Sequence, residues 1–151
     1  MNTLNKDSLN LAANKKSVTI LGSTGSIGSN TLDLISRNRD AYDIKALTAN
    51  KNVIKLAQQA KEFNVDMAVI ADSTLYSELK LALSGTNIIV GAGLEGLIEA
   101  ADMPAQWVMS SIVGAAGLGP TLTAIRRGAT IALANKECLV CAGEFMMKPI
   151  K

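Results

Sequence analysis

Histidine is absent from the 151-residue sequence, and aromatic residues make up only 3% of it. The first absence excludes histidine general bases, histidine-containing triads and histidine metal ligands within this chain. The second argues against the aromatic platforms on which single-stranded nucleic acids stack. A net charge of +2 is also too small to supply the basic face of a nucleic-acid-binding domain. We therefore expect no nucleic-acid partner.

Cysteine is scarce as well, since the chain has only Cys138 and Cys141. Two cysteines do not make a disulfide framework, so a reducing, cytoplasmic compartment is expected. Their C-x-x-C spacing has no second ligand pair for zinc, which favours two small buried residues of a helix. Long apolar runs are missing too, because serines and glycines interrupt the most apolar stretch, residues 107–118. A membrane helix needs roughly 18–20 such residues, so no membrane association is expected.

The composition that remains is globular, with 48% hydrophobic and 19% charged residues. The length predicts one compact domain. Residues 1–16 are rich in Asn and Lys and lack the apolar core of a signal peptide. We expect them to form a flexible leader, with the folded domain spanning residues 17–151.

Short apolar runs typical of buried strands alternate along the chain with segments whose apolar residues have helical spacing. The expected strands are Ser17–Gly22, Tyr42–Ala49, Asp66–Ala71, Asn87–Val90, Gln106–Ile112 and Ala129–Ala134. The expected helices are Thr31–Arg37, Val53–Phe63, Thr74–Leu83, Gly93–Ala101, Leu118–Arg127 and Lys136–Met147. This alternation predicts an α/β fold, in which helices cover both faces of a doubly wound parallel sheet in a single domain.

Two helices carry finer predictions. The apolar face of the second is expected to hold Ile54, Leu56, Ala57, Ala60 and Phe63. Its polar residues, Lys55, Gln58, Gln59 and Lys61, are expected to lie mostly away from that face. Asp72 is well placed to be the N-cap of the third helix.

The first expected strand runs directly into a glycine loop, GSTGSIG, at residues 22–28. Gly22, Gly25 and Gly28 give the spacing Gly-x-x-Gly-x-x-Gly, a relative of the dinucleotide-binding fingerprint Gly-x-Gly-x-x-Gly. Glycine permits a tight strand-to-helix turn, close approach of the backbone to a pyrophosphate and, at Gly28, close packing of the helix on the sheet. The helix N-terminus then offers N–H groups to the anion. The motif favours a Rossmann-like, dinucleotide-binding domain; a glycine turn without a ligand is the alternative.

The end of the second expected strand bears on the choice of dinucleotide. NAD sites place Asp or Glu there, about 20 residues beyond the glycines, to hold the ribose 2′-hydroxyl. Here the strand is followed by Asn50, Lys51 and Asn52, with no acid. A lysine and two amides suit a 2′-phosphate, so an NADP-type cofactor is favoured. The alternative is a solvated loop lysine beside an asparagine helix cap.

Asn135, Lys136 and Glu137 follow the last expected strand. The carboxyl ends of the strands form the ligand-binding edge of an open α/β sheet. A lysine and a glutamate there could contact cofactor and substrate together. They could equally form a solvated first helical turn, where Glu137 is favourable at the positive end of the helix dipole.

The segments GSTGSIG, LTANKN, SIVGAAGLGPTLTAI and ALANKE, in this order and spacing, resemble the 1-deoxy-D-xylulose 5-phosphate reductoisomerase family. The resemblance covers nearly everything from Ser17 to the C-terminus. It implies a full-length enzyme that converts the phosphosugar 1-deoxy-D-xylulose 5-phosphate to 2-C-methyl-D-erythritol 4-phosphate in the non-mevalonate route to isoprenoids. It also implies NADPH, a Mg²⁺ or Mn²⁺ ion and a homodimeric full-length enzyme.

The resemblance also implies roles for individual residues. The residues implied to bind the cofactor phosphates are Thr24, Gly25, Ser26 and Ile27. Those implied to surround the adenosine ribose and its phosphate are Asn50, Lys51 and Asn52. Asn135 and Glu137 would contact NADPH elsewhere, and Lys136 would contact the substrate. Three positions depart from the family pattern without removing a named contact: Asn50 for a common glycine, Ala129 for a frequent lysine and Cys138 for a frequent serine.

A larger departure concerns the metal. In this family an acidic segment, Asp-Ser-Glu-His, follows the Asn-Lys-Glu helix, whereas this chain reaches Lys151 without it. The resemblance therefore implies that the metal ligands, the lid and the C-terminal helical domain lie outside this sequence. We expect an NADPH-binding domain that, alone, binds cofactor without turnover.

Two rival interpretations remain. An aspartate-semialdehyde dehydrogenase-like cofactor domain also opens with this glycine spacing, but it needs a nucleophilic cysteine and a later histidine. A non-catalytic module that senses NADPH is the other alternative. A reading frame that continues into the acidic metal segment would favour the enzyme over the module.

Overall fold

The computed structural model describes residues 15–134. Most of the expected leader, residues 1–14, and the expected helix Lys136–Met147 with its two cysteines lie outside the described residues. The first strand begins at Lys16, one residue before the expected start of the domain. Among the described residues, no helix combines the length and apolar character needed to cross a membrane.

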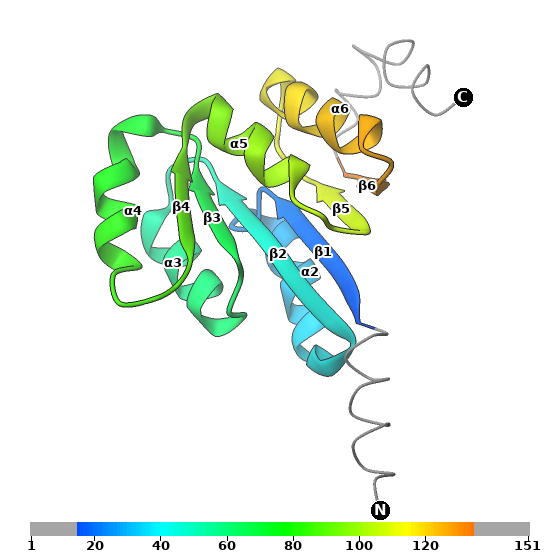
Figure 1. Ribbon diagram of the computed structural model, residues 1–151, viewed down its shortest axis with the longest axis horizontal. Coiled ribbons are helices and arrows are strands. Elements are labelled where there is room, and N and C mark those ends of the chain that lie inside the picture. The colour runs from blue at the N-terminus through cyan, green and yellow to red at the C-terminus, as the bar shows by residue number, and fades with distance from the viewer. Residues whose placement is uncertain (1–14, 135–151) are drawn as a thin grey trace, which may run out of the picture.

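Six strands form one sheet in which every neighbouring pair is parallel, as predicted. The strands are β1 (Lys16–Leu21), β2 (Tyr42–Ala49), β3 (Met67–Ile70), β4 (Ile89–Ala92), β5 (Trp107–Ser110) and β6 (Thr130–Leu133). Their order in the sheet is β4-β3-β2-β1-β5-β6 (Figure 1). The chain thus adds β2, β3 and β4 on one side of β1, and then crosses back to add β5 and β6 on the other side. This is the doubly wound, Rossmann-like arrangement.

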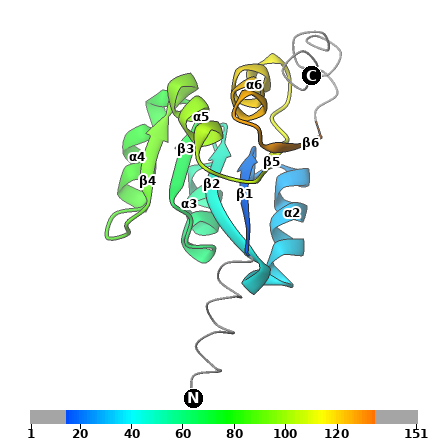
Figure 2. The ribbon, with the colours of Figure 1, turned by 45° about the vertical axis from the view of Figure 1, so that its right-hand side comes forward.

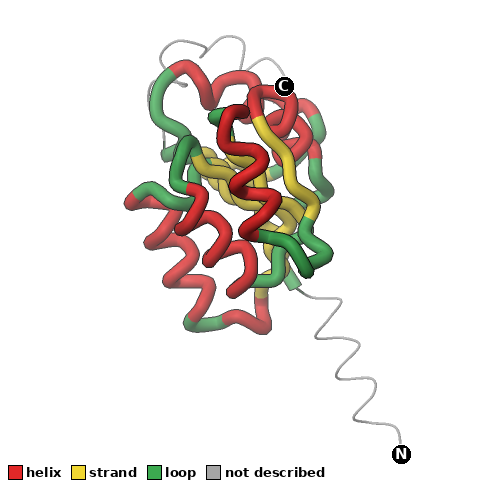
Figure 3. The backbone as a smooth tube through the Cα atoms, turned by 90° about the vertical axis from the view of Figure 1, so that its left-hand side faces the viewer, coloured by secondary structure: helices red, strands yellow, loops and turns green. Residues whose placement is uncertain are grey.

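Helices cover both faces of this sheet (Figures 2 and 3). The helices are α2 (Ser26–Ser36), α3 (Val53–Glu62), α4 (Tyr76–Ala82), α5 (Gly93–Asp102) and α6 (Leu118–Arg126). Short 3₁₀ turns precede β2, α4 and α6 at Arg39–Ala41 (η1), Ser73–Leu75 (η2) and Ala115–Gly117 (η3). Buried residues of α2, α3 and α4 form a core with one face of the sheet. Buried residues of α5 and α6 form a second core with the other face.

Two of the departures from the predicted element boundaries have a clear structural cause. α2 starts at Ser26 rather than Thr31, because the second half of the glycine loop is already its first turn and Gly25 is its N-cap. β4 is displaced by about two residues from the expected Asn87–Val90. The cause is a turn in which the Thr86 hydroxyl donates to the Leu83 carbonyl at 2.6 Å and accepts from the Ile88 N–H at 3.3 Å.

The predicted faces of α3 are wrong at two positions. Ile54, expected on the apolar face, is 75% exposed. Gln59, expected to lie away from that face, is only 9% exposed. The helix presents Gln59 to the glycine loop, where a polar partner compensates its burial. The cap prediction at Asp72 needs a smaller correction, since its carboxylate accepts from the Thr74 N–H and caps η2, which continues into α4.

Candidate functional site

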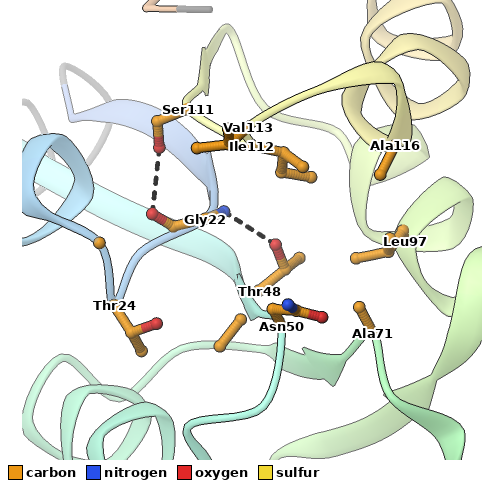
Figure 4. A pocket seen from close by; sticks show the side chains of 12 residues that line it. Gly22, Thr24, Thr48, Asn50, Ala71, Leu97, Ser111, Ile112, Val113 and Ala116 are labelled. Carbon is orange, nitrogen blue, oxygen red and sulfur yellow. Dashed lines mark hydrogen bonds between the residues drawn. The ribbon is translucent and has the colours of Figure 1, made fainter.

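A cleft of about 280 Å³ opens at the carboxyl ends of β1, β2 and β5 (Figure 4). The chain leaves β1 towards β2 but enters β5 on the other side of β1, so this is the switch point of the sheet. Ligands of open α/β sheets bind in the crevice at such a point. The cleft is lined by Gly22, Thr24, Gly25, Thr48, Ala49, Asn50, Ala71, Leu97, Ser111, Ile112, Val113 and Ala116.

The three glycines of the loop have different structural roles. Gly22 has a φ of +86°, which side chains rarely adopt, and a Cβ there would lie 3.0 Å from the Ser111 carbonyl oxygen. A Cβ at Gly28 would lie only 2.2 Å from the Gly22 carbonyl oxygen. The atoms nearest to Gly28 thus belong to the loop itself, and its predicted packing on the sheet stays a prediction. A Cβ at Gly25 would meet nothing closer than 3.9 Å, so Gly25 presents open backbone at the cleft.

Hydrogen bonds from β2 and from Ser111, which directly follows β5, hold the start of the loop. The Gly22 N–H donates to the Thr48 hydroxyl at 2.9 Å, and the Ser23 N–H donates to the Thr48 carbonyl at 2.7 Å. On the other side, the Ser111 hydroxyl donates to the Leu21 carbonyl at 2.7 Å and the Gly22 carbonyl at 3.0 Å. Figure 4 shows Thr48 and Ser111 on opposite sides of Gly22. The loop is thus fixed by β2 and by the segment after β5.

Helix α3 contributes two side chains that the sequence analysis did not assign to the site. The Lys55 ammonium donates to the Thr24 carbonyl at 3.0 Å. The Gln59 amide bonds Ser23 twice, accepting from its hydroxyl at 2.8 Å and donating to its carbonyl at 3.1 Å. Lys55 and Gln59 are one helical turn apart, so their side chains lie on the same face of α3. This spacing is the only sequence signal that both could reach the glycine loop.

The start of α2 has the properties of an anion-binding site. The first amides of a helix have no intrahelical acceptor and carry the positive end of the helix dipole. Here the N-cap is Gly25, which has no side chain to occupy those amides, and no acidic residue lies in the first turn. The Lys55 ammonium on the Thr24 carbonyl adds a positive charge beside the loop. Thr24, Gly25, Ser26 and Ile27 are therefore together at the start of α2. That they bind the cofactor phosphates stays a prediction.

The residues after β2 lie at the rim of the same cleft. Asn50 lines the cleft, and Lys51 and Asn52 follow it at exposed positions. The Asn52 side-chain oxygen accepts from the Lys55 N–H at 3.1 Å, so Asn52 is the N-cap of α3, as the alternative interpretation of this loop held. This cap uses the oxygen of the amide and leaves its NH₂ group as a donor.

A carboxylate does lie near Lys51, but it comes from the next strand. Asp72 follows β3, and its N–H donates to the Asn50 carbonyl at 3.0 Å. The pKa of Asp72 is lowered, first by the hydrogen bond from the Thr74 hydroxyl, then by the Thr74 N–H and, less strongly, by the charge of Lys51. Thr74 bonds one oxygen of this carboxylate, and Lys51 forms no ion pair among the described residues.

Asn135, Lys136 and Glu137 lie outside the described residues. The chain approaches them at the expected edge, since the Ala134 N–H donates to the Ser110 carbonyl at 2.9 Å, beside the end of β5. The segment 111–116 forms a wall of the cleft that the sequence analysis did not assign to the site. Within residues 15–134, no group of three or more Cys, Asp or Glu side chains is arranged to hold a metal ion.

The parallel doubly wound sheet, with a glycine loop and a cleft at its switch point, defines a Rossmann-like α/β domain. The family model for 1-deoxy-D-xylulose 5-phosphate reductoisomerase matches residues 18–143. The chain belongs to this family. This assignment displaces the aspartate-semialdehyde dehydrogenase-like alternative.

Individual relatives agree with this assignment. The chain is 55% identical over 136 residues to a 1-deoxy-D-xylulose 5-phosphate reductoisomerase of Rhodopseudomonas palustris (strain BisB18), covering 90% of this chain and 33% of the relative. It is 58% identical over 138 residues to that of Rhizobium meliloti (strain 1021), covering 90% of this chain and 35% of the relative. This chain therefore spans about a third of the length of these relatives.

Solved structures of reductoisomerases also match this chain. The Zymomonas mobilis reductoisomerase in complex with NADPH matches with a TM-score of 0.88 at 55% identity, covering 90% of this chain and 36% of that one. A reductoisomerase in complex with NADPH, fosmidomycin and magnesium matches with a TM-score of 0.85 at 42% identity, covering 89% of this chain and 33% of that one.

Proposed function

We propose that this chain is the NADPH-binding domain of a 1-deoxy-D-xylulose 5-phosphate reductoisomerase. The observation that carries the proposal is the open backbone of Gly25, at the start of α2 and at the switch-point cleft. The related structure with bound NADPH supports the choice of ligand. NADPH supplies the hydride for the reduction when it is bound.

The residues present fit this cofactor. Thr24, Gly25, Ser26 and Ile27 would bind the pyrophosphate through the start of α2. Asn50, Lys51 and the NH₂ group of Asn52 would face the adenosine ribose and its 2′-phosphate. Asn135 and Glu137 are proposed to contact NADPH and Lys136 the substrate, on the strength of their sequence motif.

The activity proposed for the whole protein follows from its family. It is the isomerisation and reduction of 1-deoxy-D-xylulose 5-phosphate to 2-C-methyl-D-erythritol 4-phosphate in the non-mevalonate isoprenoid pathway. The magnesium complexes of related structures support a Mg²⁺ or Mn²⁺ ion in the full-length enzyme. We also propose a homodimeric full-length enzyme that requires no membrane or nucleic-acid partner. The low cysteine content supports a cytoplasmic location.

Calorimetric titration of the chain with NADPH and with NADH tests the proposal. A charge-assisted contact with the 2′-phosphate is worth about 1.5–3 kcal/mol, so NADPH should bind about tenfold more tightly or better. Lys51→Glu should narrow or reverse this preference. Lys61→Glu, an exposed site at the far end of α3, makes the same charge change away from the cleft and should preserve it. Equal affinities of the parent chain for the two cofactors would refute the assignment.

A further inference from the structure

Gln59 is the buried polar side chain of α3, and both halves of its amide bond the same residue of the glycine loop. Its oxygen accepts from the Ser23 hydroxyl at 2.8 Å, and its nitrogen donates to the Ser23 carbonyl at 3.1 Å. Ser23 is fully buried, and its hydroxyl also lies 3.2 Å from the Thr48 carbonyl. Burying an amide is unfavourable unless it is hydrogen-bonded, and here each end of the amide has a partner.

These bonds fix the orientation of peptide planes. In a trans peptide the carbonyl and the following N–H point in opposite directions. The Ser23 carbonyl points to Gln59, so the Thr24 N–H points away from α3. The Thr24 carbonyl points to the Lys55 ammonium, so the Gly25 N–H points away from α3 as well. Thr24 and Gly25 both line the cleft.

We propose that Gln59 is a positioning residue for the cofactor pyrophosphate. It acts through Ser23, whose carbonyl also accepts a longer hydrogen bond from the Ser29 hydroxyl at 3.3 Å. By holding that carbonyl on the α3 side with the shorter bond of 3.1 Å, Gln59 keeps the Thr24 N–H available to the anion. Lys55 does the same for the next peptide. The inference rests on the proposed function for its ligand, although the orientation of the loop depends on the hydrogen bonds alone.

The test compares Gln59→Met with Gln58→Met. Methionine keeps the length and helix preference of glutamine but removes both hydrogen bonds, and Gln58 is the exposed neighbour on the same helix. Calorimetry measures the binding of NADPH and of adenosine 2′-monophosphate, which has the ribose phosphate but no pyrophosphate. We expect Gln59→Met to weaken NADPH binding about fivefold to tenfold, and adenosine 2′-monophosphate binding less than twofold. Gln58→Met should change neither.

A purely structural role gives a different result. Gln59→Met would then lower the thermal unfolding midpoint while both ligands keep their affinities or lose them equally, and either pattern overturns the inference. If the parent chain binds no NADPH, the proposed function fails, and hydrogen exchange at the Thr24 and Gly25 amides decides the positioning role separately. Slower exchange of these two amides in Gln59→Met than in Gln58→Met, because they turn from the open cleft towards α3, supports the role, whereas equal or faster exchange contradicts it.

Gln59→Glu is the second variant, for the case in which Gln59→Met does not fold. At neutral pH its carboxylate accepts from the Ser23 hydroxyl but repels the Ser23 carbonyl. Protonation restores the donor, so the ratio of its NADP⁺ dissociation constant to that of the parent should fall between pH 7.5 and pH 5. A ratio that stays constant with pH would contradict the role of the Ser23 carbonyl.

Discussion

Two buried threonine hydroxyls differ in whether they have a hydrogen-bond partner. Thr121 of α6 lies 2.7 Å from the Ser110 hydroxyl, and both residues are fully buried. Thr19, at the centre of β1, is also fully buried, but its hydroxyl has no partner among the described residues. An unpaired buried hydroxyl costs stability, whereas a paired one adds to it.

Thr19→Val should therefore raise the free energy of unfolding by about 1 kcal/mol, since valine keeps the branched shape that suits a strand. Thr121→Val makes the same chemical change where it leaves the Ser110 hydroxyl unpaired, and should lower that free energy by about 1–3 kcal/mol. Urea denaturation of the three proteins measures both differences. A destabilised Thr19→Val would mean that the hydroxyl is paired in solution.

We expect two glycines of the loop to have different roles, with Gly28 needed for folding and Gly25 for binding of the cofactor. Gly28→Ala places a methyl group 2.2 Å from the Gly22 carbonyl oxygen, so we expect a strongly lowered unfolding midpoint. Gly25→Ala meets only ordinary contacts, and Gly25 has a φ of −74°, which alanine adopts readily. That variant should fold with a nearly unchanged midpoint but bind NADPH more weakly, because its methyl group lies where the pyrophosphate would approach. Thermal unfolding and calorimetry check the two variants, and an unchanged affinity in Gly25→Ala would place the ligand elsewhere.

Asn52 and Gln59 show what single residues reveal before the structure is known. Asn52 follows a strand and precedes a helical pattern, which is the local signature of a cap, and the cap is present. Gln59 has no such signature, because its burial depends on Ser23, 36 positions away in the sequence. The local sequence pattern therefore predicted the cap at Asn52, but it could not predict the burial of Gln59.

At the level of elements, the cap at Asp72 makes the stability of the η2–α4 segment depend on pH. The pKa of Asp72 is lowered from its usual value of 3.8, chiefly by the hydrogen bonds from Thr74. A lowered pKa in the folded state means that the ionised carboxylate stabilises the fold. This contribution is present above pH 3.8 and is lost as the pH falls through the folded-state pKa.

Asp72→Ala should accordingly have a lower thermal midpoint than the parent at pH 5 to 7. This difference should shrink as the pH falls below 3.8, because the parent then loses the ionised cap as well. Asp40→Ala, which removes an exposed acid from η1, serves as the control for loss of charge alone. A difference for Asp72→Ala that persists unchanged at pH 3 would contradict the role of the ionised carboxylate.

The elements themselves were predictable where the apolar pattern was local. All six strands and all five helices of the described part lie close to their expected segments. The errors occurred where a side chain or a loop sets a boundary, as the Thr86 hydroxyl does before β4. The early start of α2 has the same origin, since the glycine spacing predicted a turn but not that its second half is helical.

At the level of the molecule, the alternation of strands and helices predicted a parallel sheet, but it did not determine the strand order. That order brings residues 111–116 against the glycine loop, about 90 positions away, and so completes the cleft. Two of its walls, the loop after β1 and the end of β2, were predicted from motifs. The third depends on β5 pairing with β1, which periodicity alone does not specify.

The largest-scale prediction concerns turnover by the 151-residue chain. The family reaction needs a metal ion to polarise the substrate oxygens, and Mg²⁺ takes oxygen ligands, commonly carboxylates, in near-octahedral geometry. The described residues hold no group of three acidic or cysteine side chains suited to a metal ion. After Asn135, the acidic residues of the sequence are Glu137 and Glu144. We propose above that Glu137 contacts the cofactor.

We therefore expect this chain to bind NADPH without oxidising it in the presence of substrate, at any concentration of Mg²⁺ or Mn²⁺. Absorbance at saturating 1-deoxy-D-xylulose 5-phosphate measures this, and a full-length relative of the family provides the positive control. Because calorimetry of the same preparation reports cofactor binding separately, a folded, NADPH-binding chain without turnover would locate the metal-dependent chemistry in the two thirds of the relatives that this chain does not span. Metal-dependent turnover by the purified chain would instead show that its own residues complete the active site, and the assignment of Glu137 to the cofactor would then be wrong.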